Sequence, residues 1–151
     1  DERLIHGQVV LGWGSQIRPD RYVVVDDDLA ASEWEQELYR LGAGDTEVAF
    51  RTVAEARDQL AEWRESALRT VVLLRDVTTL LRLAEGGALR GQGVNLGGLH
   101  HGSGRRQVLS YLHLSGDDLA GLASLEDDGV QLWAQDLPDA AKVPLRSLLG
   151  A

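Results

Sequence analysis

The sequence predicts an α/β domain with an open, mainly parallel, doubly wound sheet, helices on both faces, and near-edge strands toward the C-terminus. Three observations support this fold class. Short β-rich runs alternate with helical patterns along the chain, and the connections between them are short. Two of the runs are also uninterrupted apolar stretches, which is typical of strands buried on both faces of a parallel sheet.

The first half of the chain accounts for the parallel strands and the first two helical patterns. We expect strands at residues 22–25, 47–51 and 71–74. Between them, two sets of apolar residues each share one helical face: Ala30, Trp34, Leu38 and Leu41, then Val53, Ala56, Leu60 and Trp63. Thr52 and Glu55 have the spacing of a capping box, which predicts a helix start at residue 53.

The second half begins with another helical stripe and then changes its pattern. Val77, Leu80, Leu81 and Ala84 form the stripe, and Gly86-Gly87 should end it. Residues 108–114 and 130–134 alternate polar and apolar side chains, as near-edge strands would. Ser115 with Asp118 should cap the helix between them, whose apolar positions are Leu119, Leu122 and Leu125.

Composition limits the kind of protein this is. The chain has 151 residues and 44% hydrophobic content, and no linker or repeat divides it, so we expect a single domain over residues 1–151. The absence of cysteine excludes disulfides and cysteine-based sites. A net charge of −9 with scattered basic residues argues against nucleic-acid binding. Apolar runs are far shorter than the roughly 20 residues that span a bilayer, so we expect no direct membrane insertion.

The heptapeptide RLIHGQV, residues 3–9, holds the strongest candidate for chemistry. Its histidine, His6, precedes a helical pattern whose first turn would contain Gly7 and Gln8. Free N–H groups and the positive end of a helix make such a position suitable for an anion. An imidazole is neutral and nucleophilic near pH 7, so His6 is a plausible phosphoryl acceptor.

This heptapeptide, preceded by Asp1-Glu2, resembles the active-site loop of the IIB subunits of the mannose/fructose/sorbose family of the bacterial sugar phosphotransferase system (PTS). Residues 23–30, VVVDDDLA, resemble the second strand and turn of that family, and residues 94–99, VNLGGL, resemble its VNxGG segment. The resemblance implies that a short family strand preceding Asp1 is missing from this chain.

By this resemblance, His6 takes a phosphoryl group from a histidine of a IIA partner and passes it to a sugar imported through the membrane subunits IIC and IID. The chain would then be a cytoplasmic phosphotransferase component of the protein-Nπ-phosphohistidine–sugar class. Arg3 would compensate the phosphoryl charge, assisted by the N–H groups of Gly7 and Gln8. Asp1, also by similarity, would support the loop by holding Arg3 or an imidazole N–H. We expect His6 to be solvent-accessible, as docking of a donor requires.

Four further residues are expected at the rim of the site, because loops at the carboxyl ends of parallel strands gather there. These residues are Asp26, His100, His101 and Arg105. Family members often carry an apolar or aromatic residue in place of the paired histidines, so this loop departs from the family pattern. His113 is expected to be structural. Neither the histidine pair nor residues 26–28 form a convincing metal site, and no nucleotide motif is present, so we infer no cofactor.

Two alternative functions stay open at this stage. The chain could be a regulatory phosphoprotein of the same fold that is not coupled to transport, and the departures around His100 favour keeping this alternative. It could also be a non-catalytic α/β domain that binds a small ligand, in which His6 is incidental. The oligomeric state is open as well, although exposed tryptophans would suggest an interface, such as that of a homodimer.

Overall fold

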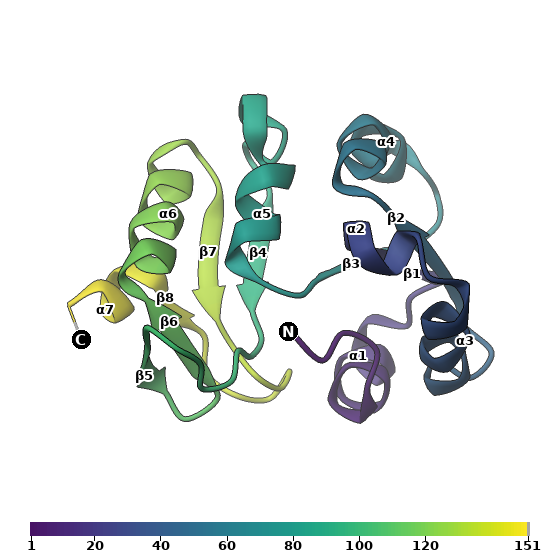
Figure 1. The fold of residues 1–151 in the computed structure, drawn as a ribbon, viewed down its shortest axis with the longest axis horizontal. Helices are drawn as coiled ribbons and strands as arrows, with labels where there is room; N and C mark the ends of the chain where they lie inside the picture. Colours follow the sequence, from purple (N-terminus) through teal and green to yellow (C-terminus); the bar gives the residue numbers. More distant parts are fainter. Residues whose placement is uncertain (151) are drawn as a thin grey trace. The chain divides into compact units, whose positions relative to one another are not determined.

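The computed structural model describes residues 1–150, which form the helices and strands of Figure 1. Their contacts divide them into two compact units. The first unit is Arg3–Arg75, and the second consists of Asp1–Glu2 together with the chain from Asp76 onward. Each is described separately below. None of the helices within residues 1–150 combines the length and the apolar content that crossing a membrane takes.

The first unit is built on a parallel sheet of three strands with the order β2-β1-β3. The strands are β1 (Arg21–Val25), β2 (Glu47–Arg51) and β3 (Thr70–Leu74). Both neighbours of β1 run parallel to it. The apolar run of β1 is buried from Tyr22 to Val25. The prediction of three parallel strands in this half of the chain is therefore confirmed.

Helices cover both faces of this sheet (Figure 1). They are η1 (Gln8–Trp13, a π-helix), α1 (Gly14–Ile17), α2 (Asp27–Ala30), α3 (Glu33–Gly42) and α4 (Val53–Glu65). Alternate residues of a strand point to opposite faces. Tyr22 and Val24 join one core with Leu4 and Val9, so Val23 faces the opposite side. The loop of residues 3–9 is thereby anchored in the main core of the first unit.

The helix predicted around residues 30–41 differs from the structure in two ways. Helix α2 ends at Ala30, and α3 starts only at Glu33, after a break at residues 31–32. The shared face of α3 does not enter the core either, because Trp34, Leu38 and Leu41 are 69%, 59% and 80% exposed. The opposite side of α3 holds it in place, where Tyr39 packs on the core with its ring 6.3 Å from that of Phe50.

The second unit contains a sheet with the order β4-β7-β8 and a separate hairpin, β5-β6. Strands β4 (Gly93–Leu96) and β7 (Gln131–Ala134) are parallel, and the short β8 (Val143–Pro144) is antiparallel to β7. The helices are α5 (Val77–Leu83), η2 (Glu85–Gly87), α6 (Gly116–Asp127) and α7 (Leu145–Leu149). The α/β class with mainly parallel strands, predicted from the sequence, is confirmed.

The strand predicted over residues 108–114 is wrong. The chain instead turns at residues 110–111, between β5 (Arg105–Leu109) and β6 (Leu112–Ser115), which pair antiparallel. The alternation of polar and apolar residues in the sequence does not stop at the turn. In β6, Leu112 and Leu114 point inward, while β5 is largely exposed. Periodicity alone therefore could not reveal the reversal.

A capping side chain lies at each of four strand-to-helix junctions. Asp26 and Thr52 follow β1 and β2 directly. Asp76 follows β3 after one intervening residue, Arg75, and Ser115 is the last residue of β6. Each accepts a hydrogen bond from the backbone N–H three residues later. Thr52 with Glu55 and Ser115 with Asp118 form full capping boxes, so both predicted boxes are confirmed. The helices consequently start close to the carboxyl ends of these strands.

Candidate functional site

The loop that carries His6 has an unusual backbone conformation. Leu4 is fully buried, yet it adopts a left-handed φ of 58°. A bulky residue rarely takes this conformation unless the surrounding structure imposes it. The carbonyl oxygen of Leu4 consequently lies 3.0 Å from Nδ1 of His6. Since a carbonyl can only accept, the contact is a hydrogen bond when the Nδ1 of the ring carries a proton.

The helix that follows His6 begins with wide turns. The backbone oxygen of His6 accepts hydrogen bonds from the N–H groups of Val9, at 3.1 Å, and Val10, at 2.9 Å. Residues 8–13 then form a π-helix, a conformation that is rare and frequent at functional sites. Gly14 continues the helix against the hydroxyl of Tyr22, whose pKa is raised by burial. The His6 loop is thus fixed at both ends by buried groups.

Arg3 and Gln8 lie together beside this loop. The Nη2 atom of Arg3 donates to Oε1 of Gln8 over 3.0 Å, and Arg3 is exposed. His6 itself is half-buried, and its Nε2 atom is covered. The expected accessibility of the imidazole is therefore met only in part.

Asp26, expected at the rim, is a buried residue with two structural contacts in the first unit. Its Oδ1 atom caps α2 through the N–H of Leu29, and its Oδ2 atom lies 3.6 Å from Nε of Arg75. This arrangement fits the capping duty that its position after a strand indicates. That Asp26 also reaches the His6 loop stays a prediction.

Asp1 and the double glycine of the VNLGG segment fit closely together in the second unit. A Cβ atom at Gly98 would lie 3.1 Å from Oδ2 of Asp1, and one at Gly97 would lie 3.5 Å from its Cβ. Space at Gly98 is limited further by the backbone oxygen of Tyr111. Small residues at both positions therefore allow Asp1 to approach the end of β4.

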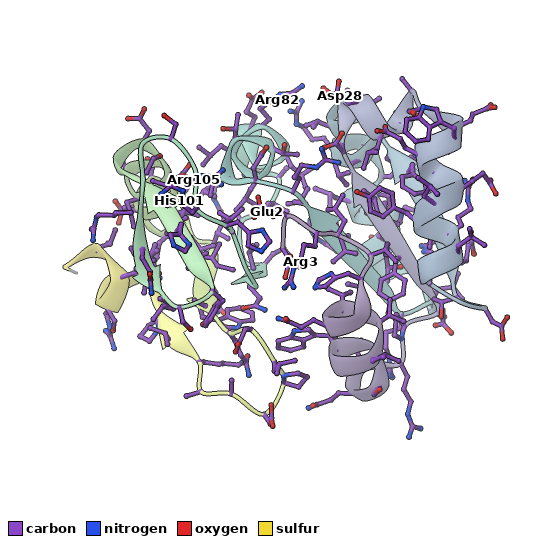
Figure 2. All side chains as sticks on the ribbon, turned by 60° about the horizontal axis from the view of Figure 1, so that its bottom comes forward. Glu2, Arg3, Asp28, Arg82, His101 and Arg105 are labelled. Atoms are coloured by element: carbon purple, nitrogen blue, oxygen red, sulfur yellow. The ribbon has the colours of Figure 1, made fainter. Side chains whose placement is uncertain are left out.

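Glu2 links two other residues of the second unit, His100 and Arg105. Its Oε1 atom accepts from the backbone N–H of His100 and contacts Nδ1 of the same residue. Its Oε2 atom lies 3.9 Å from Nη1 of Arg105, which also donates to the backbone oxygen of His100 over 3.2 Å. Glu2 and Arg105 are labelled in Figure 2. Sequence reasoning missed Glu2, since its place between Asp1 and Arg3 was the only available signal.

The two remaining histidines of this region pack on each other. The rings of His101 and His113 meet edge-on with centroids 5.9 Å apart. His113 also places Nδ1 at 3.2 Å from the backbone oxygen of Leu99, which fits the structural role expected for it. Asn95, a second residue that the sequence did not single out, donates from Nδ2 to the oxygen of Gln135 and ties the end of β4 to the loop after β7.

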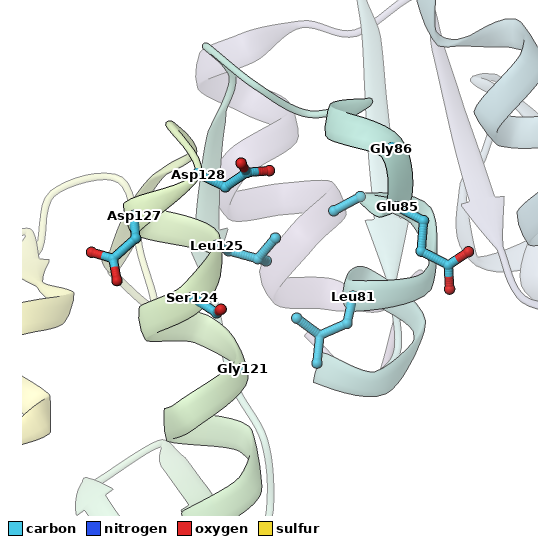
Figure 3. A pocket seen from close by; sticks show the side chains of 9 residues that line it. Leu81, Glu85, Gly86, Gly121, Ser124, Leu125, Asp127 and Asp128 are labelled. Carbon is cyan, nitrogen blue, oxygen red and sulfur yellow. The ribbon is translucent and has the colours of Figure 1, made fainter.

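An open hollow lies between α5 and α6 in the second unit (Figure 3). Its lining includes Leu81, Gly121 and Leu125 but none of the predicted site residues. The carboxylates of Glu85 and Asp127 point away from each other at its rim (Figure 3). Within residues 1–150, no three histidine, aspartate or glutamate side chains gather as a metal site would require. The hollow thus offers no convergent set of ligands.

The chain shows clear similarity to known proteins over its whole length. The family model described as "PTS system sorbose subfamily IIB component" matches residues 1–151. The N-acetylgalactosamine-specific phosphotransferase enzyme IIB component 1 of Escherichia coli (strain K12) is 30% identical over 147 residues, which cover 94% of this chain and 90% of that protein. Its crystal structure superposes with a TM-score of 0.83 and covers 95% of this chain and 94% of that one. The mannose-specific EIIAB component of the same strain is 27% identical and is covered over 46% of its length.

Proposed function

We propose that this chain, which belongs to the IIB components of the sorbose subfamily of the PTS, carries a phosphoryl group on His6. The group would come from a phosphohistidine of a IIA protein and would pass to a sugar entering through IIC and IID. Support for a IIA partner comes from the name EIIAB of the mannose-specific relative. Under this proposal the chain works in the cytoplasm as a transferase component.

The observation that supports His6 most is the strained backbone that holds its ring. A fully buried leucine at φ 58° presents its carbonyl to Nδ1 of His6. Strain of this kind costs about 1–3 kcal/mol and is concentrated at functional sites. We infer that it serves to hold the imidazole in one tautomer, with the proton on Nδ1 and the lone pair on Nε2.

The transfer step constrains which nitrogen reacts. The attacking nitrogen uses its lone pair to form a bond to phosphorus, while the P–N bond of the donor breaks and its electron pair returns to the donor imidazole. In the protein-Nπ-phosphohistidine class, the phosphoryl group is bound to Nπ, which is the atom called Nδ1 here. For this atom to react, the His6 ring would have to leave the carbonyl of Leu4 and carry its proton on Nε2 instead. We therefore propose that the ring turns before it accepts the phosphoryl group.

Charge compensation is the second requirement of the transfer. Arg3 can direct several N–H donors at the equatorial phosphoryl oxygens while one remains on Gln8. The N–H groups of Gly7 and Gln8 would add to it. By the same proposal, Asp1 supports the loop. The rim consists of Asp26 from the first unit and of His100, His101 and Arg105 from the second unit. Arg105 is the cation among them, and Glu2 holds it in place.

The test is transfer in a defined system. The chain is incubated with phosphoenolpyruvate, enzyme I, HPr and a IIA protein of the mannose family, and its mass is measured under alkaline conditions that preserve phosphohistidine. We expect one added phosphoryl group on the wild-type chain and none on His6→Ala, with folding checked by circular dichroism. His100→Ala and His101→Ala serve as matched controls and should still accept the group. Acceptance by His6→Ala, mapped to His100 or His101, would refute the assignment.

A further inference from the structure

Helix α3 presents a continuous apolar face to solvent. Trp34, Leu38 and Leu41 follow one another at spacings of four and three residues, which places them on one side of the helix. They are 69%, 59% and 80% exposed. Isolated exposed leucines are ordinary, whereas a contiguous patch of a few hundred Å² marks a binding surface in many proteins. We call these three residues the α3 stripe.

The opposite side of α3 accounts for its attachment to the first unit without the stripe. Tyr39 packs on the core, and the guanidinium of Arg40 lies 5.3 Å from the centre of the Phe50 ring. Gly42 lies against Ile5, where an added Cβ would be 3.4 Å from Cγ2. The stripe is therefore not needed for these contacts, and its apolar character calls for a different explanation.

The C-terminal end of the stripe adjoins the His6 loop. Gly42, which follows Leu41, contacts Ile5, and Ile5 precedes His6. Seven residues of helix span about 10 Å, so the stripe leads from Trp34 to the loop over that distance. A specific interface usually takes about 800 Å² from each partner, which is more than the stripe alone exposes. The stripe and the His6 loop together come closer to this area.

Charge decides which partner fits. The acidic residues Glu33 and Glu37 are exposed on the same helix as the stripe. Its only cation, Arg40, is paired with Glu37 over 2.8 Å. A second copy of the chain would bring like charges together, and the net charge of −9 would oppose it further. The occupant should instead carry an apolar surface with lysine or arginine around it.

We propose that the α3 stripe is the docking surface for the phosphodonor protein, which engages it through an apolar surface with a basic rim. This inference rests on the proposed function, because only a donor has to bring its own phosphohistidine to His6. The helix would bind the body of the donor, and the adjoining loop would receive its reacting group. Docking at this adjoining apolar patch would align the two imidazoles before transfer.

The test separates binding from transfer. Initial rates of phosphoryl transfer are measured against the concentration of phosphorylated IIA for the wild type, Trp34→Ala and Leu38→Ala. We expect KM to rise roughly tenfold or more in each variant, as for truncation of interface anchors, with the rate at saturation unchanged. The matched control is Leu68→Ala, an exposed leucine of the first unit in the connection before β3, and its KM should stay at the wild-type value.

A charge reversal adds a second readout. Glu33→Lys should raise KM at low salt, and the difference from wild type should shrink as salt is added, because rim charges act mainly on the association rate. All variants are checked by thermal unfolding, which should be unchanged for these exposed positions. A rise in KM that only follows a loss of folded protein would count against the proposal.

The possible failures are distinguishable. A wild-type chain that accepts no phosphoryl group from any IIA would overturn the proposed function and the docking surface with it. A wild type that accepts the group, with stripe variants of unchanged KM, would overturn the docking surface alone. In that case, a second copy would be identified as the occupant if sedimentation showed the wild type as a dimer and Leu38→Glu as a monomer. If the stripe variants instead lost only the transfer of the phosphoryl group to sugar, measured in vesicles that contain IIC and IID, the membrane subunits would be the occupant of the stripe.

Discussion

Replacing Leu4 by alanine and by glycine would separate the packing of this residue from its backbone strain. Leu4 is fully buried and has a φ of 58°. Truncation of a buried leucine to alanine costs about 2.7–5 kcal/mol. In a chain of this size, a loss of about 3 kcal/mol would lower the melting temperature by about 6–12 °C. Leu4→Ala should therefore be clearly destabilised while it keeps the strained φ.

At position 4, the usual order of stability, in which an alanine variant is more stable than a glycine variant, should be reversed. Glycine normally destabilises a protein by about 0.5–1 kcal/mol relative to alanine, because the unfolded chain gains freedom. At a left-handed φ, however, alanine carries a steric cost of about 1–2 kcal/mol that glycine avoids. The glycine variant should thus be as stable as the alanine variant, or up to about 1.5 kcal/mol more stable.

Urea unfolding followed by tryptophan fluorescence would measure both free energies of unfolding, and transfer from phosphorylated IIA would measure function. If Leu4→Gly were less stable than Leu4→Ala by more than about 0.5 kcal/mol, the usual glycine penalty would apply and the strain argument would be refuted. Phosphoryl acceptance per folded molecule should rise in the glycine variant, since a freer carbonyl releases Nδ1 of His6 more readily for the proposed ring turn. Unchanged acceptance in both variants would mean that the contact with Leu4 does not prepare the ring.

Three further predictions concern a close contact, a helix cap and the transfer itself. Gly14→Ala should destabilise the fold by about 1–3 kcal/mol in urea unfolding, because the new Cβ would lie 2.8 Å from the buried hydroxyl of Tyr22; a stability equal to wild type would show that this contact relaxes freely. The capping hydrogen bonds from Thr52 lower the pKa of Glu55. The stability that wild type gains over Glu55→Gln should therefore be present at pH 7 and should vanish as the pH falls through that lowered pKa. A stability difference that does not change with pH would contradict the cap. Quenched-time-point assays of phosphoryl transfer should show Arg3→Ala roughly 100-fold slower than wild type and Arg3→Lys slowed less, since lysine keeps the charge but lacks the planar fork. Equal transfer rates for the three proteins would remove Arg3 from the mechanism.

Much of the fold could be predicted because its signals are local. The run of buried residues in β1 and the capping box at Thr52 each depend on a few neighbouring side chains. The helical face of Trp34, Leu38 and Leu41 was recognised as apolar, but periodicity does not say whether such a face points inward. The turn at residues 110–111 contains no glycine, proline or asparagine that would have indicated it.

The sequence could nominate residues for the candidate site, whereas it could not predict their conformation. His6, Arg3 and Gln8 were nominated by the resemblance of their heptapeptide to the family loop, together with their place before an apolar helical pattern. The structure places Arg3 against Gln8. The left-handed backbone of Leu4 had no sequence signal, since leucine avoids that conformation. Tertiary packing imposes it, and the Nδ1 contact of His6 depends on it. The pairing of Glu2 with His100 is likewise a contact between residues far apart in sequence.

The capped strand-to-helix junctions also determine where the chain can be cut or extended. At Asp26, Thr52, Asp76 and Ser115, a side chain at or just after the end of a strand caps the next helix, so an inserted residue would remove the cap from its helix. Circular permutation, affinity tags and proteolytic nicking should fail there. The better sites are exposed turns with glycine at positive φ, such as Gly44 and Gly91, where an added segment disturbs neither a cap nor a strand.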